Sequence, residues 1–153
     1  MLIEDKLKDL GYEFPDSPAP LANYVTVRKS GKRIYTSGSG PIVNGIPSIQ
    51  GRVGSEVTLE QAYEAARLTA VNLLSMVKSE IGDLSRIRVV KLLGFVNSSP
   101  DFFRQAEVIN GASDLFVEVL GENGKHARSA IGTSVLPFNI PVEIEMVAEV
   151  IDK

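Results

Sequence analysis

An apolar repeat at helical spacing over residues 58–81 is the feature that most constrains the fold. Apolar side chains recur there every three or four positions, at Leu59, Ala62, Ala66, Ala70, Leu73, Val77 and Ile81. Thr58 and Gln61 match a capping box, in which each side chain bonds the other residue's backbone N–H, and Gly82 is a residue type that commonly ends helices. The pattern predicts one long amphipathic helix that packs on an apolar layer.

The next segment, residues 86–97, predicts a strand in that layer. It is apolar on both sides of an extended chain, with Ile87, Val89, Leu93 and Phe95 on one side and Val90, Leu92 and Val96 on the other. Strands of this kind are typically central in a sheet. A second helix is expected from about Pro100, a residue favoured at the first helical position, to Leu120 before Gly121.

Four further segments predict strands because they are rich in β-branched and aromatic residues or alternate apolar with polar ones. They are residues 24–29, 33–37, 127–137 and 142–150. The first two are separated by Ser30, Gly31 and Lys32, which predicts a hairpin. One more short strand is expected near Ile49 and Gln50.

Residues 1–19 are expected to form a short amphipathic helix and a Pro-containing connector. Because the chain shows no repeat and no convincing internal boundary, we expect a single domain over residues 1–153. The predicted class is α+β, a mixed sheet of five to six strands with two long helices on one face. Two helices cannot cover both faces of such a sheet, so we expect self-association to cover the other.

The composition excludes several kinds of chemistry. The chain has no Cys and one His, which removes thiol nucleophiles and makes a dedicated transition-metal site unexpected. Its net charge is −3 and its 16 basic residues are scattered, which argues against nucleic-acid binding. No stretch approaches ~18 apolar residues and the first residues are charged, so we expect a cytoplasmic protein without membrane contact. His126, in a Gly-Lys-His loop, is expected at the surface.

Arg128 stands near the start of the predicted strand at residues 127–137, among the small residues Ser129, Ala130 and Gly132. A guanidinium offers a planar fork of donors that matches a carboxylate, and small neighbours allow a ligand to approach the backbone closely. The alternative is a salt bridge at the sheet rim between Arg128 and a strand glutamate. The pattern alone favours this alternative.

The last predicted strand carries three carboxylates on one side, those of Glu143, Glu145 and Glu149. On a solvated face these are ordinary surface charges. In a cleft at a subunit boundary, partial desolvation would raise the pKa of a carboxyl group and suit it to acid–base chemistry near neutral pH. The residues leave both possibilities open, and position favours Glu143, which lies nearest the turn at residues 136–141.

Besides the long helix, several short motifs occur in a fixed order along the chain: Thr36-Ser37-Gly38, Val96-Asn97 before a Phe-rich helix, Ala127-Arg128-Ser129, Leu136-Pro137 and Val142-Glu143-Ile144-Glu145. Together they resemble the Rid (YjgF) family over roughly residues 20–150. The resemblance implies a chorismate-mutase-like subunit that assembles as a homotrimer with three pockets at the subunit boundaries. It also implies hydrolysis of reactive enamine and imine acids, such as 2-aminoacrylate, to 2-keto acids and ammonia without a cofactor or a metal.

The resemblance further implies roles for individual residues. Arg128 is similar to the family arginine that binds the substrate carboxylate, and Glu143 to the glutamate that positions or activates the attacking water. Other residues are expected to line the substrate pocket, namely Tyr24, Ser37, Gly38, Asn110 and Ala130, the last through its backbone where many relatives have Cys. Carboxylate binding thereby replaces the rim salt bridge as the favoured role of Arg128.

Two departures from the family pattern indicate a divergent branch. Gly132 stands where bulkier residues are common, and residues 1–14 add a helix that could cap a pocket. Two other functions therefore stay open. The chain could be a non-catalytic trimer that binds a keto acid or an amino acid. A ribonuclease is less favoured, because the sequence has neither a basic patch nor a pair of histidines.

Overall fold

A five-stranded mixed sheet forms the centre of the computed structural model, which describes residues 1–16, 19–20 and 22–152. The strands are β1 (Val27–Ser30), β2 (Arg33–Thr36), β5 (Ile87–Asn97), β6 (Ala127–Thr133) and β7 (Val142–Val150). Their order is β1-β2-β7-β5-β6, and only β5 and β6 run parallel. The predicted α+β class is confirmed with five strands, and β6 lies at a sheet edge. Residues 17–18 of the predicted connector lie outside the described residues.

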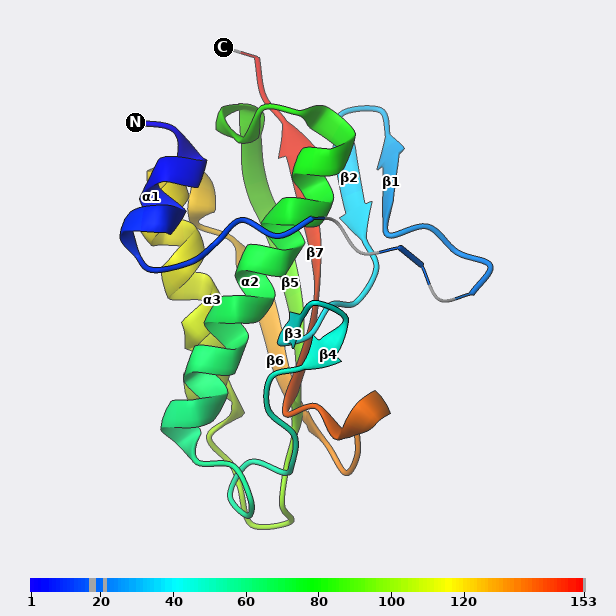
Figure 1. Ribbon diagram of the computed structural model, residues 1–153, viewed down its shortest axis with the longest axis vertical. Helices are drawn as coiled ribbons and strands as arrows, with labels where there is room; N and C mark the ends of the chain where they lie inside the picture. Colours follow the sequence, from blue (N-terminus) through cyan, green and yellow to red (C-terminus); the bar gives the residue numbers. More distant parts are fainter. Residues whose placement is uncertain (17–18, 21, 153) are drawn as a thin grey trace.

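Two long helices, α2 (Leu59–Ile81) and α3 (Gln105–Leu120), cover one face of the sheet (Figure 1). The capping box between Thr58 and Gln61 forms as predicted, and Gly82 follows the last residue of α2. The two helices approach closely at Gly111 of α3, where a Cβ atom would overlap the carbonyl oxygen of Tyr63 in α2. The predicted placement of both helices on one face is confirmed.

The second long helix begins later than predicted. α3 starts at Gln105 rather than at Pro100, because the preceding residues form a turn tied to another loop. The Phe102 N–H donates to the Ser99 carbonyl oxygen (3.0 Å), and Ser99 Oγ donates to the Val53 carbonyl oxygen (3.1 Å). The local turn and the contact with Val53 fix residues 99–102 in a conformation that the helix cannot include.

The expected strand near Ile49 does not form. Instead, β3 (Ile42–Val43) and β4 (Ile46–Pro47) pair as a small separate hairpin. Its turn places Asn44 and Gly45 at positive φ, 51° and 77°, and these are the residue types that accept the left-handed region most readily.

A β-bulge changes which side chains of β5 face the helices. The pairing of β5 with β7 shifts register between Val89 and Lys91, so the alternation changes phase there. After the bulge the buried, helix-facing positions are Leu92, Gly94 and Val96, whereas Leu93 and Phe95 are half-buried on the opposite side. The predicted division of this strand into two sides is therefore wrong beyond Val89, although its central place next to β7 is confirmed.

The other face of the sheet has no helix over it among the described residues (Figure 1). It exposes apolar side chains such as Tyr35 (44% exposed) and Ile131 (45%) beside the half-buried Phe95. Apolar area of this kind on a sheet is typical of a surface that another protein covers. Self-association through this face stays a prediction.

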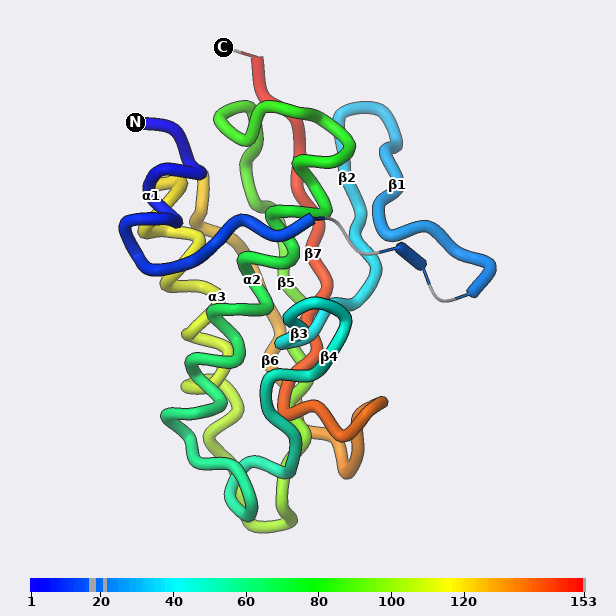
Figure 2. The backbone as a smooth tube through the Cα atoms, viewed as in Figure 1, coloured from blue at the N-terminus to red at the C-terminus, as the bar shows by residue number. Residues whose placement is uncertain are grey.

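The predicted N-terminal helix is confirmed as α1 (Ile3–Asp9), which packs against the other helices. Leu7 is fully buried, and Lys6 Nζ donates to the Val119 carbonyl oxygen at the end of α3 (3.2 Å). The chain then crosses α2 (Figure 2), where Ser75 Oγ donates to the Pro15 carbonyl oxygen (2.6 Å). The N-terminal segment thus belongs to the helical layer. None of the described helices is long and apolar enough to cross a membrane.

Candidate functional site

Arg128 lies on the edge strand β6 and points to the helix-facing side, as does its neighbour Leu92 on β5. Its Nη1 donates to Ser113 Oγ (3.0 Å) and its Nη2 to the Ala106 carbonyl oxygen (3.2 Å), both on α3. It makes no ion pair with any carboxylate of the described residues, so the rim salt bridge is absent. Since a guanidinium has five N–H groups, three have no hydrogen-bond partner among the described residues.

Glu143 lies on β7 and points to the opposite, open face of the sheet, across from Phe95. Its carboxyl group is half-buried, and this burial raises its pKa, with a smaller contribution from the nearby Glu145. Gly38 lies directly against it, because a Cβ atom there would come within 3.0 Å of Glu143 Cδ and Oε2. The missing side chain at Gly38 therefore makes room for the carboxylate.

The three carboxylates of β7 have different surroundings. Glu149 accepts a hydrogen bond from Arg88 Nε (2.7 Å), and Glu145 is exposed. Glu143 alone combines partial burial with the absence of a hydrogen bond or ion pair to any described side chain. These surroundings are those of a cleft carboxylate rather than of an ordinary surface charge, and an acid–base role for Glu143 stays a prediction.

Backbone and hydroxyl contacts hold Tyr24, Ser37 and Gly38 near one another. The Ser37 N–H donates to the Thr26 carbonyl oxygen (2.8 Å), and Ser37 Oγ donates to the Val25 carbonyl oxygen (2.7 Å). Tyr24 precedes these acceptors and is 48% exposed. The hydroxyl of Ser37 thus serves to fix the two segments side by side, next to the residue that contacts Glu143.

The structure does not bring Arg128 and Glu143 together within one chain. β5 lies between their strands, the two side chains project from opposite faces, and their neighbours on β5 are Leu92 and Phe95. From ordinary strand dimensions, their backbones are about 10 Å apart along the strands and about 10 Å apart across them. One small ligand can contact both side chains only if a second copy of the chain supplies one of them.

Ala130 lies on the same strand as Arg128, whereas Asn110 lies on α3. Ala130 shares the helix-facing side of β6, pairs with Gly94 and packs partly buried against the core. Asn110 faces a groove of about 410 Å³ between α2 and α3, which is lined by Leu59, Glu60, Tyr63, Glu64, Glu107, Asn110 and Asp114. This groove could not be predicted from the sequence, because it depends on how the two helices pack.

His126 was expected at the surface but is half-buried beneath α3. Its Nε2 lies 2.9 Å from Ser113 Oγ, its Nδ1 lies 2.6 Å from the Gly124 carbonyl oxygen, and its ring meets the edge of Phe116. Burial lowers the pKa of His126, the bond to Gly124 opposes this shift, and the positive charge of Arg128 adds to it. The sequence did not reveal these surroundings, because Ser113 and Phe116 reach the ring from α3.

The chain matches a family model described as "YjgF/chorismate mutase-like, putative endoribonuclease" over residues 4–150. The protein belongs to the YjgF (Rid) family. The resemblance seen in the sequence is thereby confirmed. Among the described residues, no group of three or more His, Asp or Glu side chains is arranged to hold a metal ion.

Known members and structural neighbours place this YjgF-family chain near a divergent branch. It is 42% identical over 145 residues to the protein TCP17 of Trypanosoma cruzi, covering 94% of this chain and 91% of that protein. The crystal structure of Atu1372 from Agrobacterium tumefaciens, whose function is unknown, matches with a TM-score of 0.92 and 49% identity, over 97% and 92% of the two chains. Escherichia coli TdcF with bound serine shares the fold, with a TM-score of 0.63 and 22% identity over 87% and 92% of the chains.

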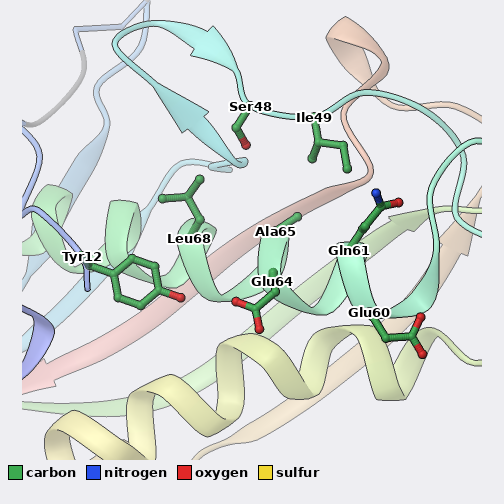
Figure 3. A pocket seen from close by; sticks show the side chains of 8 residues that line it. All are labelled: Tyr12, Ser48, Ile49, Glu60, Gln61, Glu64, Ala65 and Leu68. Atoms are coloured by element: carbon green, nitrogen blue, oxygen red, sulfur yellow. The ribbon is translucent and has the colours of Figure 1, made fainter. Parts of the chain in front are cut away.

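A concave region larger than the groove at Asn110 lies over the other side of α2 from that groove's α3 residues (Figure 3), and the two share Glu60 and Glu64. Its volume is about 530 Å³, and it is lined by Tyr12, Ser48, Ile49, Glu60, Gln61, Glu64, Ala65 and Leu68. None of the site residues expected from the sequence is among them. Tyr12 belongs to the N-terminal segment and lines this cavity. The described part of that segment therefore borders this cavity rather than the expected site.

Replacing Glu143 with Gln is expected to stabilise this YjgF-family fold at neutral pH. Burial raises the folded-state pKa of the carboxyl group, so its ionisation favours the unfolded chain as the pH rises through that pKa. The gain in Tm should therefore appear at pH 7 and disappear at pH values below 4.5, the usual pKa of a glutamate. Thermal unfolding at fixed protein concentration measures it, with the exposed Glu145→Gln as control. An equal gain in the control would contradict the assignment.

Proposed function

We propose that this protein hydrolyses reactive enamine and imine acids of the 2-aminoacrylate type to 2-keto acids and ammonia. The observation that carries the proposal is the state of Arg128. It is a half-buried cation at a sheet edge, held by two hydrogen bonds and free of any described carboxylate. A guanidinium held in this way can bind a substrate carboxylate through two parallel hydrogen bonds.

Imine hydrolysis requires little more of the protein than holding the substrate and a water molecule in position. 2-Aminoacrylate takes up a proton at its methylene carbon to give the imine, and the protonated imine is electrophilic at carbon 2. Water adds there to form a tetrahedral carbinolamine, which expels ammonia and leaves pyruvate. Holding the imine by its carboxylate next to a bound water turns a bimolecular step into a local one.

Glu143 is the proposed acceptor for the proton of the attacking water. The raised pKa of its carboxyl group brings it closer to the pH at which the protein works, which is what an acid–base catalyst requires. Gly38 leaves the space beside the carboxylate, and Tyr24, Ser37 and Asn110 with the backbone of Ala130 are proposed to line the pocket. No described residue neutralises Glu143 with an ion pair.

We place each site between two subunits of a homotrimer. Arg128 and Glu143 occupy opposite faces of one sheet, so each site would combine Arg128 of one copy with Glu143 of another. The open sheet face, with Tyr35, Phe95 and Ile131, supplies the apolar surface for such an assembly. Formation of the trimer would also cover the face that the helices leave uncovered.

A coupled assay tests the activity. A threonine dehydratase acting on serine releases 2-aminoacrylate, which hydrolyses slowly on its own, and added protein is expected to speed the appearance of pyruvate. The dehydratase alone sets the background, and an active imine deaminase shows that the assay responds. Unchanged pyruvate release in the presence of that working control would refute the activity.

Binding without turnover is the alternative that the same arginine allows. Because TdcF was solved with bound serine, serine and pyruvate are suitable probes for a trimer that only holds an amino acid or a keto acid. Saturable binding of either probe to the wild-type protein, with no acceleration in the coupled assay, would favour this alternative. The net charge of −3 and the single histidine, His126, give no support to ribonuclease activity.

Gly38→Ala is expected to lower the imine hydrolysis rate without unfolding the protein. The added Cβ would come within 3.0 Å of Glu143 Oε2, so the carboxylate must move, and loss of a positioned general base typically costs about 10²-fold or more. The coupled assay measures the rate and circular dichroism the fold. Gly31→Asn, at a turn where φ is +60°, a conformation that asparagine accepts, and where a Cβ would meet nothing within 4 Å, is the control for glycine replacement. Full activity in Gly38→Ala would argue against Glu143.

A further inference from the structure

A series of hydrogen bonds connects the Gly124 carbonyl oxygen to the guanidinium of Arg128. His126 Nδ1 lies 2.6 Å from that carbonyl oxygen, and His126 Nε2 lies 2.9 Å from Ser113 Oγ. The same Oγ accepts a hydrogen bond from Arg128 Nη1 over 3.0 Å. The proposed mechanism uses neither Ser113, which bonds its central cation directly, nor His126, which reaches that cation through Ser113.

The chemistry of these groups fixes the direction of each hydrogen bond. A carbonyl oxygen can only accept, so His126 Nδ1 carries the hydrogen that binds Gly124. Burial favours the neutral imidazole, whose Nε2 is then an acceptor. The Ser113 hydroxyl must donate to Nε2, which turns its lone pairs toward Arg128. The arrangement therefore presents an acceptor, not a donor, to the guanidinium.

The network is anchored on α3. Ser113 belongs to α3, and the Ala106 carbonyl oxygen of the same helix accepts the second bond from Arg128 (3.2 Å). Gly124 packs so closely on α3 that a Cβ atom would overlap the Phe116 carbonyl oxygen. Ser113 Oγ and the Ala106 carbonyl oxygen, both on α3, each accept one N–H of the guanidinium, and its other N–H groups have no described partner.

We propose that Ser113 and His126 are positioning residues that hold the Arg128 guanidinium in the orientation in which it binds the substrate carboxylate, an inference that rests on the proposed function. A long arginine side chain otherwise loses rotamer freedom when it binds. Ser113 and His126 restrict the Arg128 side chain before the substrate binds, so less rotamer entropy is lost on binding. Neither contacts the reacting atoms, so their effect should appear in carboxylate affinity.

Calorimetric titration with pyruvate tests the inference. Ser113→Ala is expected to raise the Kd about three- to tenfold, the usual effect of losing one hydrogen bond. Ser113→Thr keeps the hydroxyl and should restore most of the affinity. Ser79→Ala, which removes a helix hydroxyl that bonds only the Met76 carbonyl oxygen of its own helix, should leave the Kd unchanged.

Nitrogen-15 NMR supplies a signature that a merely structural role would not give. His126 is the only histidine in the chain, so its ring signals need no assignment by mutation. The neutral Nδ1–H form is expected in the wild type, with an Nε2 signal that moves in Ser113→Ala and stays in Ser79→Ala. An Nε2–H form, or an unchanged Kd in Ser113→Ala while the wild type binds pyruvate, would overturn the inference alone. A wild type that binds no pyruvate and shows no turnover would overturn the proposed function as well.

Discussion

Arg128→Lys is expected to slow the hydrolysis of 2-aminoacrylate by about 10- to 150-fold, which corresponds to the roughly 1.5–3 kcal/mol of a hydrogen bond to a charged group. Lysine keeps the charge but is a point donor on a flexible stem, and it cannot present the planar fork that matches a carboxylate. It also cannot bond Ser113 and Ala106 together while leaving a pair of donors for substrate. The coupled pyruvate assay measures the loss.

The control for this charge-conserving change is Arg86→Lys. Arg86 is exposed and lies in the short helical turn just before β5, next to Ile87, the first residue of β5, which pairs with Val150. Its replacement should leave the rate within about twofold of the wild type, as for most surface substitutions. Normal activity in Arg128→Lys would reject the assigned role of the guanidinium, whatever the control shows.

Gly111→Ala is expected to lower the free energy of unfolding by about 1–3 kcal/mol, the usual cost of overpacking a close contact. At an exposed helix position the same replacement would raise the free energy of unfolding by roughly 0.5–1 kcal/mol. The sign of the measured change therefore shows whether position 111 is in close contact. The new Cβ would overlap the Tyr63 carbonyl oxygen, a backbone atom that cannot rotate away. α2 and α3 would have to separate along their contact.

Denaturant unfolding followed by circular dichroism measures this effect. Val117→Ala lies on the exposed side of α3 and is the matched small change on the same helix. It should shift the free energy of unfolding by no more than about 0.5 kcal/mol. A Gly111→Ala protein as stable as the wild type, or more stable, would show that the helices are not in contact at this point.

Elements whose signals are local could be predicted from the sequence. α2 follows from its apolar spacing, its capping box and Gly82, all within one stretch of chain. The phase change of β5 beyond Val89 could not be predicted, because the bulge appears only in the pairing with β7. The late start of α3 has the same cause, since Ser99 is held by Val53 from a distant loop.

The candidate site shows the same division. Arg128 and Glu143 could be selected from the sequence, and strand alternation shows which side of each strand they occupy. That the two sides belong to opposite faces of one sheet depends on the strand order, which the sequence did not reveal. His126 carried no signal beyond being the only histidine, because Ser113 reaches it from the preceding helix.

We propose that one active site combines Arg128 of one subunit with Glu143 of another. Mixing two inactive variants tests it directly. Arg128→Ala and Glu143→Gln are purified separately, dissociated, combined in equal amounts and allowed to reassemble before the coupled assay. Each site that draws Arg128 from the Glu143→Gln chain and Glu143 from the Arg128→Ala chain is complete.

Random reassembly is predicted to restore about a quarter of the wild-type activity, because each site takes its two residues from two independently chosen subunits. Each variant dissociated and reassembled alone should stay inactive, and the wild type carried through the same steps sets the full scale. If the wild type regains its oligomeric state and activity after the same steps but the mixture of variants stays inactive, the result would contradict a site shared between subunits.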